Sequence, residues 1–214
     1  MDVHMIPGRG INSNIYILTE GEQAFIVDAG MGTHYDYIKD NLRRYVHPDA
    51  VTCIIITHEH FDHTGGIDNL IEICPNAQVC MHKQCMYALE QKITGTSTAM
   101  GKSMPAVHRI VNNGDIIELG SSQLEVLSTP GHSIGSMCLY DKKTETLFSG
   151  DTVFSNGDVG RTDLEGGDIT ELVKSLQKLM KLNIKNIYPG HGPSVIGEGK
   201  HNLTLAYKNI QYCL

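Results

Sequence analysis

Short apolar runs rich in β-branched residues recur along the chain and predict β-strands. The run over residues 51–56 has the length and composition of a buried strand. Two earlier runs are joined by the turn 19–22 and predict a hairpin. The five runs between 108 and 148 are separated by turn-forming residues and predict a meander. The predicted strands cover residues 14–18, 24–27, 51–56, 78–81, 108–111, 116–119, 124–127, 137–140, 146–148 and 186–188.

Apolar side chains spaced three and four residues apart predict helices between these strands. The helix over residues 34–46 ends before Pro48, and a second helix, closed by Pro75, is expected to begin inside the polar segment after strand 51–56. Asp168 can cap a later helix, and Glu171 three residues on strengthens that start. The predicted helices cover residues 34–46, a segment ending near 74, 83–93, 169–180 and 200–210.

Strands followed by helices occur twice over along the chain. We therefore expect two similar halves whose sheets pack face to face with the helices outside, because each apolar face must be covered. The predicted fold is of the α/β (α+β) class, a four-layer αββα sandwich in one domain spanning residues 1–214. A chain of 214 residues is long enough to bury a sizeable core.

Composition and charge exclude several classes of partner. No apolar run approaches the roughly 18 residues of a membrane span, so no membrane association is expected. Residues 1–7 lack the basic start and apolar middle of a secretory signal, which makes the cytoplasm the expected location. The six cysteines show no C-x-x-C pair, and Cys53 and Cys138 lie inside predicted strands, so no disulfide framework is expected. A net charge of -7 without clustered Lys and Arg argues against a nucleic-acid partner.

The densest group of candidate ligands directly follows the strand predicted at 51–56. Three histidines and one aspartate fall within six residues, namely His58, His60, Asp62 and His63. Imidazole and carboxylate are ligands that divalent zinc, iron or manganese accept. In a tight turn His58 and His60 point the same way, while Asp62 and His63 lie further round, so one turn can begin two metal sites. The alternative is a solvated histidine-rich turn.

Three further potential ligands occupy matching positions in the chain. His132, Asp151 and His191 each follow a strand-like run within a few residues. Side chains at strand ends can meet at one edge of a sheet although they lie far apart in sequence. A metal site therefore explains the pattern better than a solvated turn.

Together these motifs resemble the metallo-β-lactamase superfamily, and the resemblance covers nearly the whole chain. It implies two divalent metal ions, with zinc expected and iron or manganese also suited to the ligands. It also implies that Asp28 supports the metal-binding turn through hydrogen bonds without touching metal. The family pattern assigns His58, His60 and His132 to one metal, Asp62, His63 and His191 to the other, and Asp151 to a bridge between them.

The segment 160–164, Gly-Arg-Thr-Asp-Leu, resembles the glyoxalase II-like enzymes and their persulfide dioxygenase relatives. The resemblance implies a sulfur-containing small-molecule substrate. We expect hydrolysis of a hydroxyacyl thioester by hydroxide generated at two metals, with Asp62 orienting that hydroxide and receiving its proton. The alternative is a persulfide dioxygenase with one non-haem iron held by His58, His132 and Asp151.

Several features are open at the level of sequence. Glyoxalase II carries a C-terminal helical extension that holds glutathione, whereas only 23 residues follow His191, so this short form is expected to use another thiol or a looser pocket.

Arg161 either pairs with a ligand aspartate or is a surface residue, and His82 either lines the pocket or caps a strand. Residues 94–105 are predicted to form a surface loop that provides a wall of the site. A homodimer is compatible with the fold. A non-catalytic metal-binding protein would lack a ligand, and none is missing.

Overall fold

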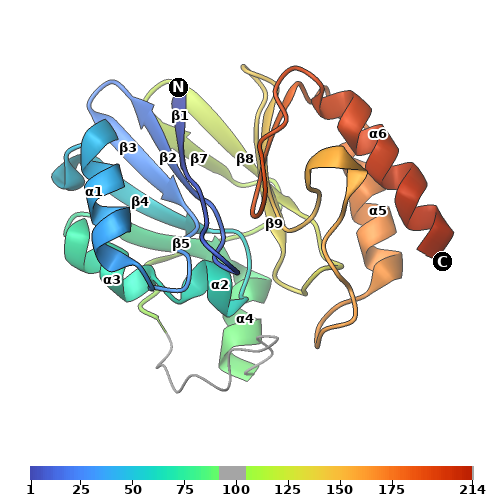
Figure 1. Ribbon diagram of the computed structural model, residues 1–214, viewed down its shortest axis with the longest axis horizontal. Helices are drawn as coiled ribbons and strands as arrows, with labels where there is room; N and C mark the ends of the chain where they lie inside the picture. Colours follow the sequence, from blue (N-terminus) through green and yellow to red (C-terminus); the bar gives the residue numbers. More distant parts are fainter. Residues whose placement is uncertain (92–104, 214) are drawn as a thin grey trace.

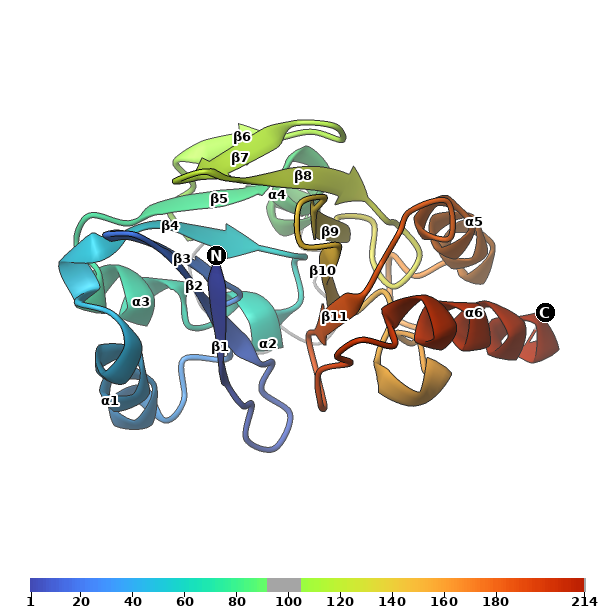
Figure 2. The ribbon, with the colours of Figure 1, turned by 90° about the horizontal axis from the view of Figure 1, so that it is seen from above.

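The computed structural model describes residues 1–91 and 105–213. Two β-sheets pack face to face, and helices cover the outer face of each sheet (Figure 1). A view from above shows the same layers, with α1 (Tyr35–Tyr45) and α3 (Ile67–Ile73) on one side and α5 (Ile169–Leu179) and α6 (Gly199–Ile210) on the other (Figure 2). The predicted four-layer αββα sandwich is confirmed.

The first sheet has six strands in the order β1-β2-β3-β4-β5-β6. Strand β2 runs antiparallel to its two neighbours β1 and β3, whereas β3 to β6 run parallel. Parallel neighbours end at the same edge of a sheet, so the segments that follow β4 and β5 leave the sheet side by side. The strands are β1 (Asp2–Ile6), β2 (Ile15–Glu20), β3 (Gln23–Val27), β4 (Val51–Ile56), β5 (Gln78–His82) and β6 (Arg109–Val111).

The second sheet has five strands in the order β11-β10-β9-β8-β7. Strands β7 to β10 form an antiparallel meander, and β11 pairs parallel with β10. The chain therefore leaves β10 and β11 at the same edge. The strands are β7 (Ile116–Leu119), β8 (Ser122–Ser128), β9 (Met137–Asp141), β10 (Thr146–Gly150) and β11 (Asn186–Pro189).

Strand β4 shows why the longest apolar run of the sequence is a strand. Ile54 and Ile56 pack in the core between the first sheet and its helices, whereas Cys53 and Ile55 pack in the core between the two sheets. Side chains alternate between the faces of a strand, and both faces of this one are covered, so every position but the exposed Thr52 is apolar. A third core joins the second sheet to α5 and α6.

Two predictions about strands were incomplete. Residues 108–111 were assigned to the meander, but β6 pairs parallel with β5 in the first sheet, and the turn at 112–115 carries the chain across to the second sheet. Strand β1 was not predicted, because its sequence mixes polar and apolar residues; it forms the edge of the first sheet and pairs only with β2.

The helix expected to begin inside the polar segment does not begin there. The polar segment forms a separate four-residue helix, α2 (Phe61–Thr64), and α3 begins only after Gly65 and Gly66. A Cβ atom at Gly66 would lie 2.0 Å from the Ala29 carbonyl oxygen, so the chain packs tightly against the end of β3 at this break. The helix predicted at 83–93 is α4 (Lys83–Gln91), and its last two residues and nearly all of the predicted loop at 94–105 lie outside the described residues.

The described cysteines agree with the absence of a disulfide framework. Five cysteines are buried free thiols. The side chain of the sixth, Cys213, lies outside the described part.

Within residues 1–91 and 105–213, no helix has the length and apolar character needed to cross a membrane. That the chain forms one domain of two similar halves stays a prediction.

Candidate metal centre

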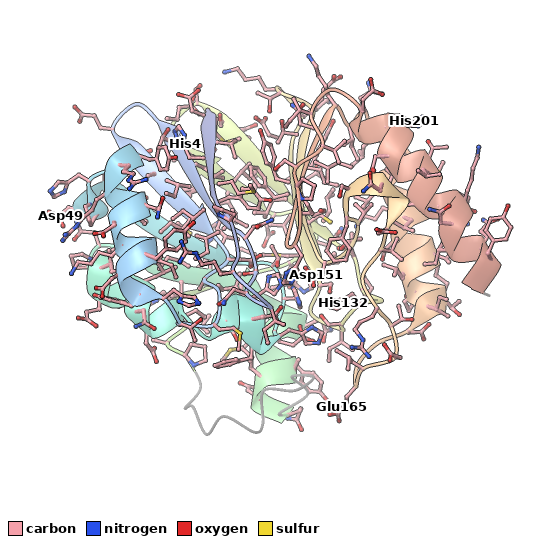
Figure 3. All side chains as sticks on the ribbon, viewed as in Figure 1. His4, Asp49, His132, Asp151, Glu165 and His201 are labelled. Atoms are coloured by element: carbon pink, nitrogen blue, oxygen red, sulfur yellow. The ribbon has the colours of Figure 1, made fainter. Side chains whose placement is uncertain are left out.

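The structure brings the seven candidate ligands to one edge of the sandwich. The histidine-rich turn follows β4 of the first sheet, whereas His132, Asp151 and His191 follow β8, β10 and β11 of the second. Figure 3 shows His132 and Asp151 side by side between the outer helical layers, far from the peripheral Asp49 and His201. Two groups form, within each of which the donor atoms lie within 4.8 Å of one another: His58, His60 and His132, and Asp62, His63, Asp151 and His191.

The first group consists of three buried imidazoles. His132 Nε2 lies 2.8 Å from His60 Nδ1, and the ring of His58 is centred 4.9 Å from that of His132. Burial and, to a smaller extent, the neighbouring imidazoles lower the pKa of His58 well below its usual value and that of His60 to about 4. The rings are therefore neutral at physiological pH, which is the form that donates a lone pair to a metal.

The second group is organised around Asp151. Asp151 Oδ1 lies 3.3 Å from His63 Nε2, and Oδ2 lies 3.5 Å from both His132 Nε2 and His191 Nε2. Asp62 Oδ2 lies 3.0 Å from His191 Nε2. Burial alone would raise the pKa of Asp151, but the neighbouring imidazoles, above all His63, lower it overall, so Asp151 is ionised. Because it reaches a member of each group, this carboxylate can bridge two cations.

The donor set fits divalent metal ions. Among the described residues, the Nε2 atoms of His58 and His60 are buried without a hydrogen-bond partner. Buried polar atoms are normally satisfied, so unpaired ones that converge with carboxylates indicate a cation. Imidazole nitrogen with carboxylate oxygen suits zinc, iron or manganese.

Asp28 makes the supporting contacts expected of it. It follows β3, and its Oδ1 accepts a hydrogen bond from Thr57 N (2.9 Å) while its Oδ2 accepts one from His63 Nδ1 (2.8 Å). Thr57 Oγ1 donates to Asp28 Oδ2 (2.9 Å) and so can accept from His58 Nδ1 (3.1 Å). These bonds place the ring protons of His58 and His63 on Nδ1 and leave both Nε2 lone pairs facing the site.

Glu59 is a residue of the site that the sequence analysis gave no role. Its side chain is 0% exposed, and it accepts hydrogen bonds from Ser133 Oγ (3.0 Å) and Gly135 N (3.4 Å). A Cβ atom at Gly135 would lie 2.2 Å from Glu59 Oε2, so the second turn is shaped around this carboxylate. Burial raises its pKa to about 7. Glu59 thus joins the turn of His58 and His60 to the turn that carries His132. The sequence feature that could have identified Glu59 is its position between His58 and His60, whose side chains point in the opposite direction.

Two glycines allow the close packing of the groups. A Cβ atom at Gly160 would lie 2.0 Å from the Asp151 carbonyl oxygen and 2.8 Å from His132 Nδ1. A Cβ atom at Gly190 would lie 2.1 Å from Asp151 Oδ1. A side chain at either position would displace Asp151 or its neighbours.

The open roles of Arg161 and His82 are resolved by their contacts. Arg161 pairs with Asp163 (2.6 Å) on the surface, so the alternative in which it pairs with a ligand aspartate is wrong. Its carbonyl oxygen instead accepts a hydrogen bond from His132 Nδ1 (2.8 Å). His82 Nδ1 accepts from Gln84 N (3.3 Å) at the start of α4, and its Nε2 lies 2.8 Å from Ser128 Oγ. His82 is therefore a capping residue, and it does not line the pocket described next.

A pocket of about 520 Å³ opens over both groups. Its size lies in the range of small-molecule sites. Five of the seven candidate ligands line it, which leaves the site open to a substrate. The lining residues are Gly10, Ile11, His60, Asp62, His132, Asp151, Phe154, Val159, Gly160, Arg161, Leu164 and His191.

Known proteins share this sequence pattern and architecture. "Probable metallo-hydrolase YqgX" of Bacillus subtilis is 32% identical over 88% of this chain and 89% of its own length. "Acyl-coenzyme A thioesterase MBLAC2" of Bos taurus is 30% identical over 85% of this chain and 74% of its own. The BLEG-1 B3 metallo-beta-lactamase superposes with a TM-score of 0.79 at 31% identity, covering 95% of this chain and 99% of that one. TTHA1623, solved in a di-iron-bound form, gives a TM-score of 0.75 at 28% identity, covering 95% and 96%.

The family model described as the metallo-beta-lactamase superfamily matches residues 8–191. The matched span begins just after β1 and ends at His191, so it contains all seven candidate ligands. With the αββα layers and the two donor groups, this match establishes the relationship: the chain belongs to the metallo-β-lactamase superfamily.

Proposed function

We propose that this protein is a thioester hydrolase that works with two divalent metal ions. The observation that carries the proposal is the sharing of Asp151 between two complete donor groups at the base of an open pocket. A single metal would leave one of these groups without a cation. The di-iron form of the related TTHA1623 supports the count of two.

In this proposal each ligand has an assigned place. His58, His60 and His132 would hold one ion and Asp62, His63 and His191 the second, and Asp151, which lies beside both groups, would be shared between them. Zinc is the expected metal, and iron or manganese also suits the donors. When bound, such a pair of ions ionises water near neutral pH and polarises the carbonyl under attack.

Asp62 is the proposed proton acceptor. It lines the pocket, and its Oδ2 is held 3.0 Å from His191 Nε2. The backbone carbonyl of Asp62 accepts a hydrogen bond from Ser13 N (3.2 Å), which fixes this residue relative to the opposite pocket wall. A carboxylate held at the mouth of the site can orient the attacking water and take its proton.

The leaving group is proposed to be a thiolate. The related Bos taurus protein is named an acyl-coenzyme A thioesterase, and a relative from Aspergillus fumigatus is named an acyl carrier protein thioesterase. The glyoxalase II-like segment at 160–164 supplies the walls of the pocket around Gly160 and Arg161. A thioester is therefore favoured over a lactam, and the hydroxyacyl thioester is the form that the sequence pattern suggests.

Metal analysis and two activity assays test the proposal. We expect two metal equivalents per purified chain, and release of free thiol from an acyl thioester without oxygen consumption. His191→Ala and His58→Ala are each expected to lower kcat/KM by at least about 100-fold, because each removes a ligand of one ion. One iron per chain, with oxygen consumed on a persulfide and little effect of His191→Ala, would instead establish the mononuclear dioxygenase.

A further inference from the structure

The pocket has an apolar side that the donor groups do not explain. We propose that this side is an acyl subsite that binds an unsubstituted aliphatic acyl group, in preference to a hydroxyacyl group. The inference rests on the proposed thioester hydrolysis, and it replaces the hydroxyacyl group that the sequence pattern suggests with an unsubstituted acyl group. The subsite is formed by Ile11, Phe154, Val159 and Leu164.

Two segments that are far apart in the sequence form the subsite. Ile11 belongs to the loop between β1 and β2, whereas Phe154, Val159 and Leu164 follow β10. The ring of Phe154 is centred 6.2 Å from that of His191, so the apolar wall begins directly beside the second donor group. An acyl carbon chain attached to a carbonyl at the donor groups would extend along this wall.

Ile11 is held in position although its side chain is 71% exposed. In its loop, Asn12 Nδ2 donates to the Arg9 carbonyl (2.8 Å), and Ser13 N donates to the Asp62 carbonyl (3.2 Å). Asn14 N donates to the Gly190 carbonyl (2.7 Å), next to His191. The loop is thus bonded to the backbone of both donor segments, which fixes the backbone of Ile11 at the rim of the pocket.

The chemistry of the lining favours an acyl group without polar substituents. Apart from the donor groups, the described lining contains one polar side chain, Arg161, which is engaged by Asp163. It contains no hydroxyl or amide side chain that could pair with a hydroxyl on the acyl group. Sites that select a substrate hydroxyl do so with a dedicated partner, whereas apolar walls select by added methylenes.

The test uses purified, metal-loaded protein and thioesters of one thiol, N-acetylcysteamine, with acetyl, propionyl, butyryl, hexanoyl and lactoyl groups. We expect kcat/KM to rise about two- to fourfold per methylene from acetyl to hexanoyl. The lactoyl ester should be a poorer substrate than the propionyl ester, which has the same number of carbons and lacks the hydroxyl group. Thioethers that lack the carbonyl provide a readout without turnover. By calorimetry, the hexyl thioether should bind at least about tenfold more tightly than the ethyl thioether.

A matched pair of variants places the effect in the pocket. Ile11→Asp is expected to reduce the gain per methylene to below about 1.5-fold, because a charge replaces the apolar wall. Ile196→Asp makes the same change at a similarly exposed isoleucine (62%) outside the pocket lining, and it should keep the wild-type gain. Both positions are on the surface, so neither change removes core packing.

The outcomes separate this inference from the proposed function. Thiol release that is fastest for the lactoyl ester, or that is independent of acyl length, overturns the acyl subsite and leaves the thioester hydrolase standing. An unchanged length dependence in Ile11→Asp also overturns it. No thiol release from any ester by protein that holds two metal equivalents overturns both the subsite and the hydrolase.

Discussion

Asp28→Asn tests which ring nitrogen of His63 carries the proton in the candidate metal centre. Asp28 has a φ of 64°, a left-handed conformation that asparagine tolerates well, so the backbone has no reason to move. The amide oxygen can keep the bond from Thr57 N, but the amide NH2 then replaces the oxygen that accepts from His63 Nδ1 (2.8 Å). Two donors would face each other. His63 must move its proton to Nε2, and the lone pair directed at the site is lost.

The magnitude follows from the role of such supporting contacts. Losing one typically weakens metal binding by about 10- to 100-fold, which is about 1.4–2.8 kcal/mol of binding free energy. The loss should fall on the second ion, because His63 belongs to the second donor group. Without metal, the free energy of unfolding should drop by about 1.5–3 kcal/mol, the contribution of a hydrogen bond to a charged group.

Metal affinity is measured by competition with a chelator of known affinity, and unfolding by urea titration of the metal-free protein. Asp36→Asn makes the same exchange at an exposed position on α1 and should match the wild type in both assays. Two metal equivalents bound by Asp28→Asn with wild-type affinity would refute the assignment of the His63 ring proton, and with it the supporting role of Asp28.

Two further predictions concern residues that shape the site. Glu59→Ala should weaken metal binding by about tenfold or more in chelator competition, because it removes the link between the turn of His58 and His60 and the turn of His132. Glu59→Gln keeps an acceptor for Ser133 Oγ and should retain most of the affinity. Gly160→Ala should lower kcat/KM by about 100-fold with an unchanged circular dichroism spectrum, because its Cβ would lie 2.0 Å from the Asp151 carbonyl oxygen; wild-type activity would contradict the geometry.

Much of the fold could be predicted because local patterns and tertiary packing agree. Strand β4 is apolar at every position but one because helices cover one face and the second sheet covers the other. The cap of α5 was readable for the same reason: Asp168 Oδ1 accepts from Thr170 N (2.7 Å) and Glu171 N (3.1 Å), contacts between residues adjacent in the chain. Local contacts of this kind can be predicted without knowledge of the rest of the fold.

The predictions that failed depend on contacts between distant segments. Residues 109–111 belong to the first sheet because they pair with Cys80 to His82 of β5. The sequence of this run does not indicate whether it pairs with β5 or with β7. Arg161 shows the same limit in the site. The sequence left open whether its guanidinium pairs with a ligand aspartate or lies on the surface. The bond to His132 comes instead from its carbonyl oxygen, and no side-chain pattern reports on a backbone acceptor.

The site depends on the contact between the sheets as much as on its ligands. The turn that carries His191 leaves the second sheet, yet it is held by polar groups of the first: Tyr16 Oη donates to the Pro189 carbonyl (2.7 Å), and Asn14 Nδ2 donates to the carbonyls of Pro189 (3.1 Å) and Gly192 (2.9 Å). Tyr16 also packs edge-on against Phe148 and Tyr188 between the sheets. The same side chain therefore closes the inter-sheet core and positions a candidate ligand. Since both tasks rest on one packing arrangement, separation of the sheets would disassemble the donor groups, and cations bound by both sheets would in turn oppose that separation.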